Sequence, residues 1–115
     1  MHTPRFLASL ILVSLWLSVA PRAFATSYMF TTLDAPGSIL TTASGINATG
    51  QIVGQFSDGT RTHGFLRDSG GSFTTLDVPG ASSTEDIGIN ATGQISGRFT
   101  DATGIHGFLR DSGGA

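Results

Sequence analysis

The chain contains no cysteine and no lysine, and it has only one tryptophan and one tyrosine among 115 residues. The absence of cysteine excludes disulfide bonds and any cysteine-based metal or thiol site. All six cationic residues are arginine, and eight acidic residues outnumber them, which gives a formal charge of −2. This balance excludes the basic surface that a nucleic-acid-binding protein needs. The length permits one small domain at most.

Residues 1–25 have the three-part pattern of a secretory signal peptide. A short positive start with Arg5 precedes an apolar run from Phe6 to Ala20, and Ala23-Phe24-Ala25 follows as a cleavage site. The apolar run is shorter than the ~20 residues that a membrane-spanning helix requires. We therefore expect a signal helix that is cleaved after Ala25, and a secreted, periplasmic or cell-surface chain without a stable membrane span.

The remaining chain is one 43-residue repeat written twice, at 30–72 and 73–115. The copies align without insertion, and 29 of 43 positions are identical. A fixed period of this length is typical of solenoids, propellers and arrays. The first copy divides into four short strand-like segments separated by turn residues, at 41–47, 51–57, 62–68 and 72–77. We therefore predict an all-β fold for residues 26–115, with tandem four-stranded antiparallel units that form two β-propeller-like blades.

The differences between the copies predict which positions face a core. Ile52, Gly54 and Phe56 recur unchanged 43 residues later, whereas the alternating positions of the same strand change. We expect the recurring positions to form a packed face and the others a looser one. Seven of the 14 differing positions lie between Ala35 and Ser44, which predicts an exposed loop there.

The order of the strands makes the two ends of the repeated region complementary. Phe30–Asp34 has the sequence of a fourth strand, and a third strand at Ile105–Asp111 comes last. We therefore expect the amino-terminal strand to complete a last blade. Because propellers need about four to eight blades, three alternatives stay open. The chain is a fragment of a longer repeat protein, or it self-associates (for example three chains making six blades), or its units stack in another array.

Two segments of each copy carry a family resemblance. Gly45–Gly54 reads GINATGQIVG and His63–Leu66 reads HGFL, and the second copy matches them at Gly88–Gly97 and His106–Leu109. These segments resemble the bacterial extracellular HAF repeat, with glycine in place of the alanine of the HAF triplet. The resemblance implies a secreted or cell-surface bacterial protein with β-propeller-like repeats. It implies no activity, substrate or catalytic residue.

One histidine and one aspartate recur in each copy as candidate ligand contacts at the rim of a blade. They are His63 with Asp58, and His106 with Asp101, and each pair spans a predicted turn. A strand histidine that is hydrogen-bonded to a turn carboxylate is the structural alternative. Metal sites use three or four ligands at definite spacing, and the dense oxygen series of a calcium loop is missing. We therefore predict no metal and no cofactor.

The Asp-Ser-Gly-Gly segments at 68–71 and 111–114 resemble protease motifs. Proteases with such motifs use far larger scaffolds, and aspartate followed by two glycines is typical of a hairpin turn. No set of nucleophile, base and orienting group can be assembled from the sequence, so we expect no enzymatic activity. The main hypothesis is a secreted non-enzymatic repeat protein that acts as a scaffold or binding module of unknown ligand. The alternative is an oligomeric, lectin-like carbohydrate-binding propeller.

Overall fold

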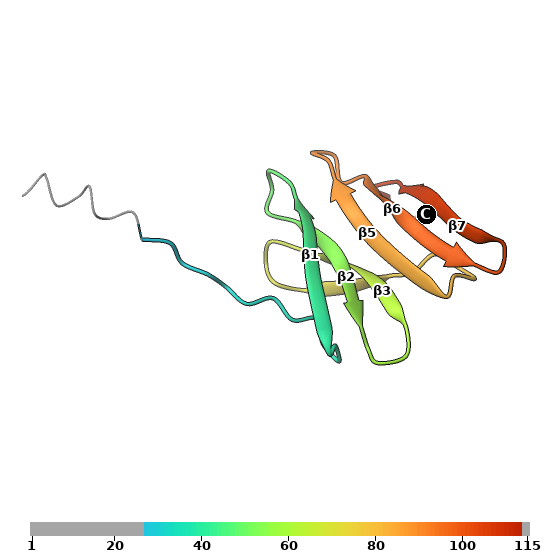
Figure 1. Cartoon of the computed structure of the whole chain (residues 1–115). Coiled ribbons are helices and arrows are strands. Elements are labelled where there is room, and N and C mark those ends of the chain that lie inside the picture. Colours follow the sequence, from blue (N-terminus) through green and yellow to red (C-terminus); the bar gives the residue numbers. More distant parts are fainter. Residues whose placement is uncertain (1–26, 114–115) are drawn as a thin grey trace, which may run out of the picture. The chain divides into compact units, whose positions relative to one another are not determined.

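The computed structural model describes residues 27–113, and all of their regular secondary structure is β-strand (Figure 1). The predicted signal helix lies outside these residues. The chain divides into two units, Met1–Thr31 and Thr32–Ala115, and every strand belongs to the second. The strands are β1 (Leu40–Ile46), β2 (Ile52–Ser57), β3 (Thr62–Arg67), β4 (Phe73–Leu76), β5 (Ser83–Ile89), β6 (Ile95–Asp101) and β7 (Gly104–Arg110). No helix within residues 27–113 is long and apolar enough to cross a membrane.

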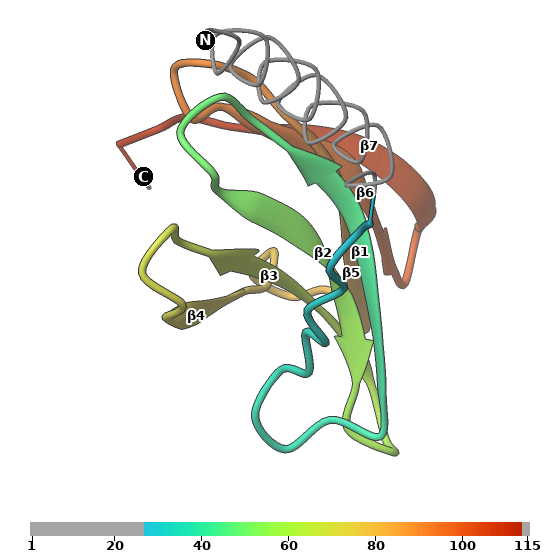
Figure 2. The ribbon, with the colours of Figure 1, turned by 90° about the vertical axis from the view of Figure 1, so that its left-hand side faces the viewer.

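The seven strands form one curled sheet, and Figure 2 shows its curvature from the side. The strand order is β1-β2-β3-β5-β6-β7, and β4 also pairs with β3. All pairings are antiparallel except that of β3 with β5, which is a single parallel pair between Thr62 and Ser83. The predicted all-β fold is therefore confirmed.

The sheet consists of two copies of one antiparallel meander, which we call the first meander (β1–β4) and the second meander (β5–β7). Leu40 of β1 lies opposite Ser57 of β2, and Ser83 of β5 lies opposite Thr100 of β6, at the same positions 43 residues later. The bulge in β1 after Ala43 also recurs in β5. The register is therefore the same in both copies, although their sequences differ at 14 of 43 positions, and each meander has a bend at the same place.

The predicted turns are confirmed, and their polar residues form the hydrogen bonds that close them. The carbonyl of Asn47 accepts the Gly50 amide at 3.0 Å, and Gly50 has a φ of 85°, which favours glycine. In the Asp-Ser-Gly-Gly turn, the Asp68 carboxylate accepts the amides of Gly70 and Ser72 at 3.0 and 2.9 Å. Asp68 is therefore a turn residue, as the hairpin interpretation predicted.

A stack of aromatic rings covers one face of the first meander, which we call its aromatic face. Phe65 is 0% exposed, and its ring centroid lies 6.5 Å from that of Phe56 and 5.4 Å from that of Phe73. Ile52 and Ala35 pack against the same cluster. The prediction of a packed face along β2 is therefore confirmed.

A glycine beneath each stack allows the ring to lie directly on the backbone. A Cβ at Gly54 would lie 2.9 Å from the Phe65 ring and 2.0 Å from the carbonyl oxygen of Thr42. A Cβ at Gly97 would meet the Phe108 ring, also at 2.9 Å. These close approaches explain why glycine occupies the middle of both central strands.

The second meander covers the opposite face of the first, which we call the glycine face because Gly45 and Gly64 lie on it. A Cβ at Gly64 would lie 2.5 Å from Oδ1 of Asp86, and one at Gly45 would lie 3.1 Å from the carbonyl oxygen of Ile87. Val53 of this face is 0% exposed. The prediction that this side of β2 is looser is therefore wrong for Val53, because strands of the neighbouring meander pack on it.

The contact between the meanders has a direction. Asp86 lies opposite Gly97, which lies opposite Phe108, so Asp86 belongs to the aromatic face of the second meander. The aromatic face of the second meander thus packs on the glycine face of the first. Within residues 27–113, nothing covers the glycine face of the second meander at Gly107, where a Cβ would meet only a backbone oxygen 3.8 Å away.

Two further sequence predictions are wrong. The variable segment 35–44 is not wholly a loop, since β1 begins at Leu40, and its counterparts Thr84 and Asp86 are 1% and 0% exposed. Thr84 is unchanged from Thr41, whereas Asp86 replaces Ala43, and within residues 27–113 only the later copy packs on a neighbouring meander at this position. Phe30–Asp34 forms no strand. The same sequence forms β4 because β3 precedes it and supplies a partner.

The stacking of the meanders predicts different effects for two equivalent glycines. We expect Gly64→Ala to lower the free energy of unfolding by ~1–3 kcal/mol, because its Cβ would overlap the Asp86 carboxylate and the carbonyl oxygen of Leu76. Gly107→Ala is the matched control and is expected to change stability by less than ~0.5 kcal/mol. Urea denaturation of both variants measures the difference. Equal effects would contradict the packing of one meander on the other.

Candidate functional site

His63 lies between two carboxylates on the aromatic face of the first meander. Its Nε2 lies 2.9 Å from Oδ2 of Asp58, in the turn between β2 and β3, and its Nδ1 lies 2.8 Å from Oδ2 of Asp77, just after β4. Carboxylate oxygens only accept hydrogen bonds, so both ring nitrogens donate and the ring carries a positive charge in this arrangement. The hydrogen bonds that His63 donates to Asp58 and then to Asp77 raise the pKa of His63.

Asp58 also closes its own turn. Its Oδ1 accepts the amides of Thr60 and Arg61 at 2.8 and 2.9 Å. The hydrogen bond to His63, followed by these amides, holds the pKa of Asp58 well below its usual range. The structure therefore brings His63 and Asp58 together, and it contains the hydrogen bond of the structural alternative. Ligand contact by this pair stays a prediction.

The equivalent pair in the second meander is less complete. His106 Nε2 lies 3.2 Å from Oδ1 of Asp101 and 2.8 Å from Oγ1 of Thr103. Hydrogen bonds from the Thr103 hydroxyl and amide lower the pKa of Asp101, and His106 contributes less. Within residues 27–113, Asp101 is the only carboxylate that pairs with His106. The second carboxylate of the first meander, Asp77, follows a fourth strand, and β7 has no such partner strand among these residues.

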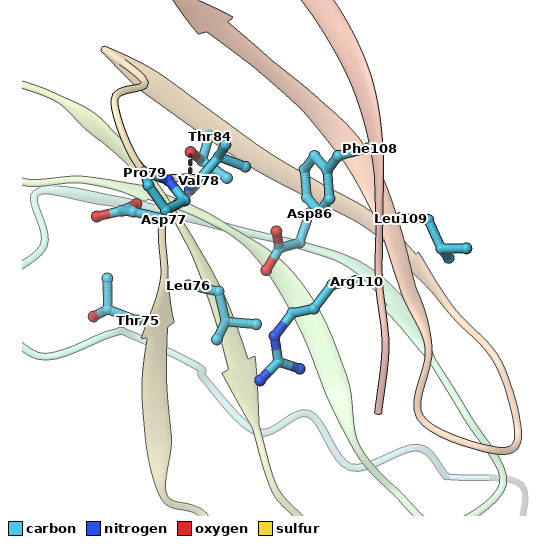
Figure 3. A pocket seen from close by; sticks show the side chains of 10 residues that line it. All are labelled: Thr75, Leu76, Asp77, Val78, Pro79, Thr84, Asp86, Phe108, Leu109 and Arg110. Atoms are coloured by element: carbon cyan, nitrogen blue, oxygen red, sulfur yellow. Dashed lines mark hydrogen bonds between the residues drawn. The ribbon is translucent and has the colours of Figure 1, made fainter. Parts of the chain in front are cut away.

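A pocket of about 400 Å³ opens between the end of β4 and the aromatic face of the second meander (Figure 3). It is lined by Thr75, Leu76, Asp77, Val78, Pro79, Thr84, Asp86, Phe108, Leu109 and Arg110. Figure 3 shows the side chains of Asp86 and Arg110 directed toward the same space, with Leu76 opposite. Asp77 therefore connects the pocket with the His63–Asp58 pair, because its carboxylate contacts His63 and Asp77 also lines the pocket.

Asp86 is the most unusual group in this pocket. It is 0% exposed, and neither of its carboxylate oxygens has a hydrogen-bond partner within the described part of the chain. Burial raises its pKa to about 7, Arg110 lowers it in part, and the negative charge of Asp77 raises it further. A buried carboxyl without partners is costly when ionised.

The sequence analysis missed Asp86 and Asp77 as site residues. The available signal for Asp86 was its difference from Ala43, the residue at the same position of the first copy. A new charge in a strand that otherwise repeats marks a changed environment. Asp77 gave no signal, since its sequence segment occurs identically in both copies.

Several titratable side chains of the first meander are engaged in structural contacts. Asp58 and Asp68 are engaged by turn amides, and His63 is held between two carboxylates. Among residues 27–113, no group of three or more His, Cys, Asp or Glu side chains is placed to hold a metal ion. What remains accessible is a pocket with apolar walls and a few charged groups, which is typical of a ligand-binding site.

No family model, no curated protein and no solved structure matches this chain.

Proposed function

We propose that the chain is a secreted, non-enzymatic repeat protein of the HAF type, whose two meanders act as propeller-like blades of a scaffold or binding module. One observation carries the proposal, namely the stacking of two antiparallel meanders that share one register. The aromatic face of the second, with Asp86, lies on the glycine face of the first at Gly64. Antiparallel sheets that repeat around an axis build β-propellers in this way.

The site supports binding because its carboxylates are held in turns or buried. A catalytic base or nucleophile needs a lone pair that the substrate can reach. Backbone amides hold the carboxylates of Asp58 and Asp68 in their turns, and Asp86, whose oxygens have no partner among the described residues, is 0% exposed. The pocket beside Phe108 and Arg110 offers an aromatic ring and a cation to a ligand.

The non-enzymatic role predicts no turnover by the purified chain. We expect no hydrolysis of peptide, ester or glycoside substrates above background, and no change in Asp68→Ala or Asp111→Ala, because these aspartates belong to turns. Chromogenic assays with the wild-type chain and both variants measure this. Reproducible turnover that disappears in either variant would overturn the proposal.

A carbohydrate-binding role is the second candidate, supported by the composition of the pocket. Sugar rings stack on aromatic side chains, and their hydroxyls bond to charged groups. Phe108, Asp77 and Arg110 supply these groups around one space. Binding on a glycan array that is lost in Phe108→Ala, but kept in the control Arg98→Ala, is the expected result. Lack of any glycan binding by a folded oligomer would reject this candidate.

A further inference from the structure

The outer edge of β7 is open, whereas the same edge of its counterpart β3 is paired. β3 lies between β2 and β4, and β7 pairs only with β6 within residues 27–113. Phe65 of β3 is 0% exposed and Leu66 is half-buried, whereas Leu109 of β7 is 66% exposed and Phe108 is half-buried. The second meander therefore lacks the cover that β4 gives to the first.

The chain carries a second copy of the missing strand. Phe30–Asp34 has the sequence FTTLD, which is also the sequence of Phe73–Asp77 at β4. Phe30 is 93% exposed, and no strand forms at residues 30–34. Phe30–Asp34 has the sequence of β4, and β7 is the counterpart of β3, the strand with which β4 pairs. Within residues 27–113, neither this segment nor the outer edge of β7 has a strand partner. Such open edges are sites of strand addition.

The stacking direction decides which β7 this segment can reach. Val78 lies two residues after β4, and its amide donates to Oγ1 of Thr84 on the aromatic face of the second meander, at 3.1 Å. The first meander, which holds β4, lies against that face. Ala35 makes the same contact with Thr41, also at 3.1 Å, and it packs into the aromatic face of the first meander.

A strand that runs into Ala35 therefore belongs to a sheet that lies on the aromatic face of the first meander. The chain's own second meander lies on the opposite, glycine face, where Asp86 meets Gly64. Its own β7 is on the wrong side. The acceptor must come from another copy of the chain.

We propose that Phe30–Leu33 of one copy pairs antiparallel with β7 of a second copy, and that Asp34 supplies the second carboxylate to the His106 of that copy. The register is that of β4 on β3, shifted by 43 residues. It places Phe30 opposite Arg110, Thr31 opposite Leu109, Thr32 opposite Phe108 and Leu33 opposite Gly107. The inference deepens the proposed function, because it rests on the blade-like stacking of the meanders.

The same pairing would give the second meander the two contacts that β4 gives to the first. In the first meander, Phe73 lies 5.4 Å from Phe65, and Asp77 binds the free nitrogen of His63. Phe30 and Asp34 of the donor copy would take these places beside Phe108 and His106 of the acceptor copy. Because donor and acceptor are different surfaces, the contact is head to tail, and it builds a ring if the rotation closes.

Backbone amides offer a clean way to break the pairing. The Asp68 amide donates to the Ser72 carbonyl on the β4 side, and amides alternate in direction along a strand. The Leu66 amide therefore faces β4, and the Leu109 amide faces the free edge. By the same alternation, the Thr31 amide faces the acceptor. Proline at either position removes one of these donors without removing an amide that β6 uses.

We therefore expect light scattering to give the full wild-type chain a mass of several chains. Thr31→Pro and Leu109→Pro should each give the mass of one chain. The matched controls Thr31→Val and Leu109→Val keep the amide and should keep the wild-type mass. A mixture of the two proline variants should form a complex of two chains and nothing larger, since one copy retains its acceptor and the other its donor.

A wild-type chain that stays monomeric would overturn the inference, as would a Thr31→Pro variant with the wild-type mass. Circular dichroism checks whether Leu109→Pro is folded. If Leu109→Pro does not fold, Thr31→Pro still tests the pairing. Asp34→Asn tests the shared site. It should weaken assembly ~10-fold, as expected for loss of a charged hydrogen bond, whereas Asp111→Asn should leave assembly unchanged. These results are separable from the proposed function, because turnover and ligand binding are measured independently.

Discussion

Replacing Phe65 with alanine is expected to lower the free energy of unfolding by ~3–5 kcal/mol. The ring is 0% exposed and lies between Phe56 and Phe73. It also rests on the backbone of Gly54, where no side chain can move in to fill the space that the ring leaves. The expected loss of stability therefore has two parts, namely the free energy gained by burying the ring and the cost of a cavity that does not collapse.

Phe108→Ala is the matched control for this prediction. Phe108 occupies the same position of the second meander, but it is half-buried and borders the pocket. We expect roughly half the effect, because less apolar area is removed from water at this site. Guanidinium denaturation, performed in the Thr31→Pro background, measures both variants without a contribution from assembly. A larger loss at Phe108 would contradict the placement of the core in the first meander.

Stability is expected to fall as pH rises from about 4 to about 7, because Asp86 must be neutral to remain buried. Burial raises its pKa from 3.8 to about 7 in the folded chain. Below pH 4 the carboxyl is protonated in both the folded and the unfolded chain, so it causes no loss. Between these values only the unfolded chain releases the proton, which favours unfolding. The full effect is on the order of 4 kcal/mol, at ~1.4 kcal/mol per pH unit, and it is complete above pH 7.

Asp86→Asn removes this titration and keeps the shape of the side chain. We expect the variant to be more stable than the wild type at pH 8, and its stability to change much less between pH 4 and 7. Asp111→Asn, in an exposed turn, is the control and should follow the wild-type profile. Thermal unfolding across the pH range measures all three. A wild-type chain whose stability rises steadily to pH 8 would show that Asp86 is ionised at no cost.

The parts of the fold that could be predicted from the sequence are local. The strands predicted at 41–47, 51–57 and 62–68 agree with β1, β2 and β3 within about a residue. The turns were predictable because Asn47 and Asp68 fix them through contacts within a few residues. The pairing of His63 with Asp58 was predictable for the same reason, since one short turn connects them.

The rest of the site depends on contacts between the meanders. Nothing within β2 indicates that Val53 is buried, because the strand that packs on this side of β2 is β5, which follows β3 and β4 in the sequence. Asp77 reaches His63 only because β4 pairs with β3. Phe30–Asp34 has the same sequence as Phe73–Asp77 and a different conformation, so local preference alone does not determine the structure of this segment.

The glycines beneath Phe65 and Phe108 also restrict how such a chain can diverge. Every missense change at Gly54 or Gly97 adds a Cβ, which would lie 2.0 Å from a carbonyl oxygen of the preceding strand. No compensating change of a side chain can relieve a clash with the backbone. These two codons should therefore accept only silent substitutions in nature. In a library of random variants selected for folding, they should be among the columns with the lowest sequence entropy.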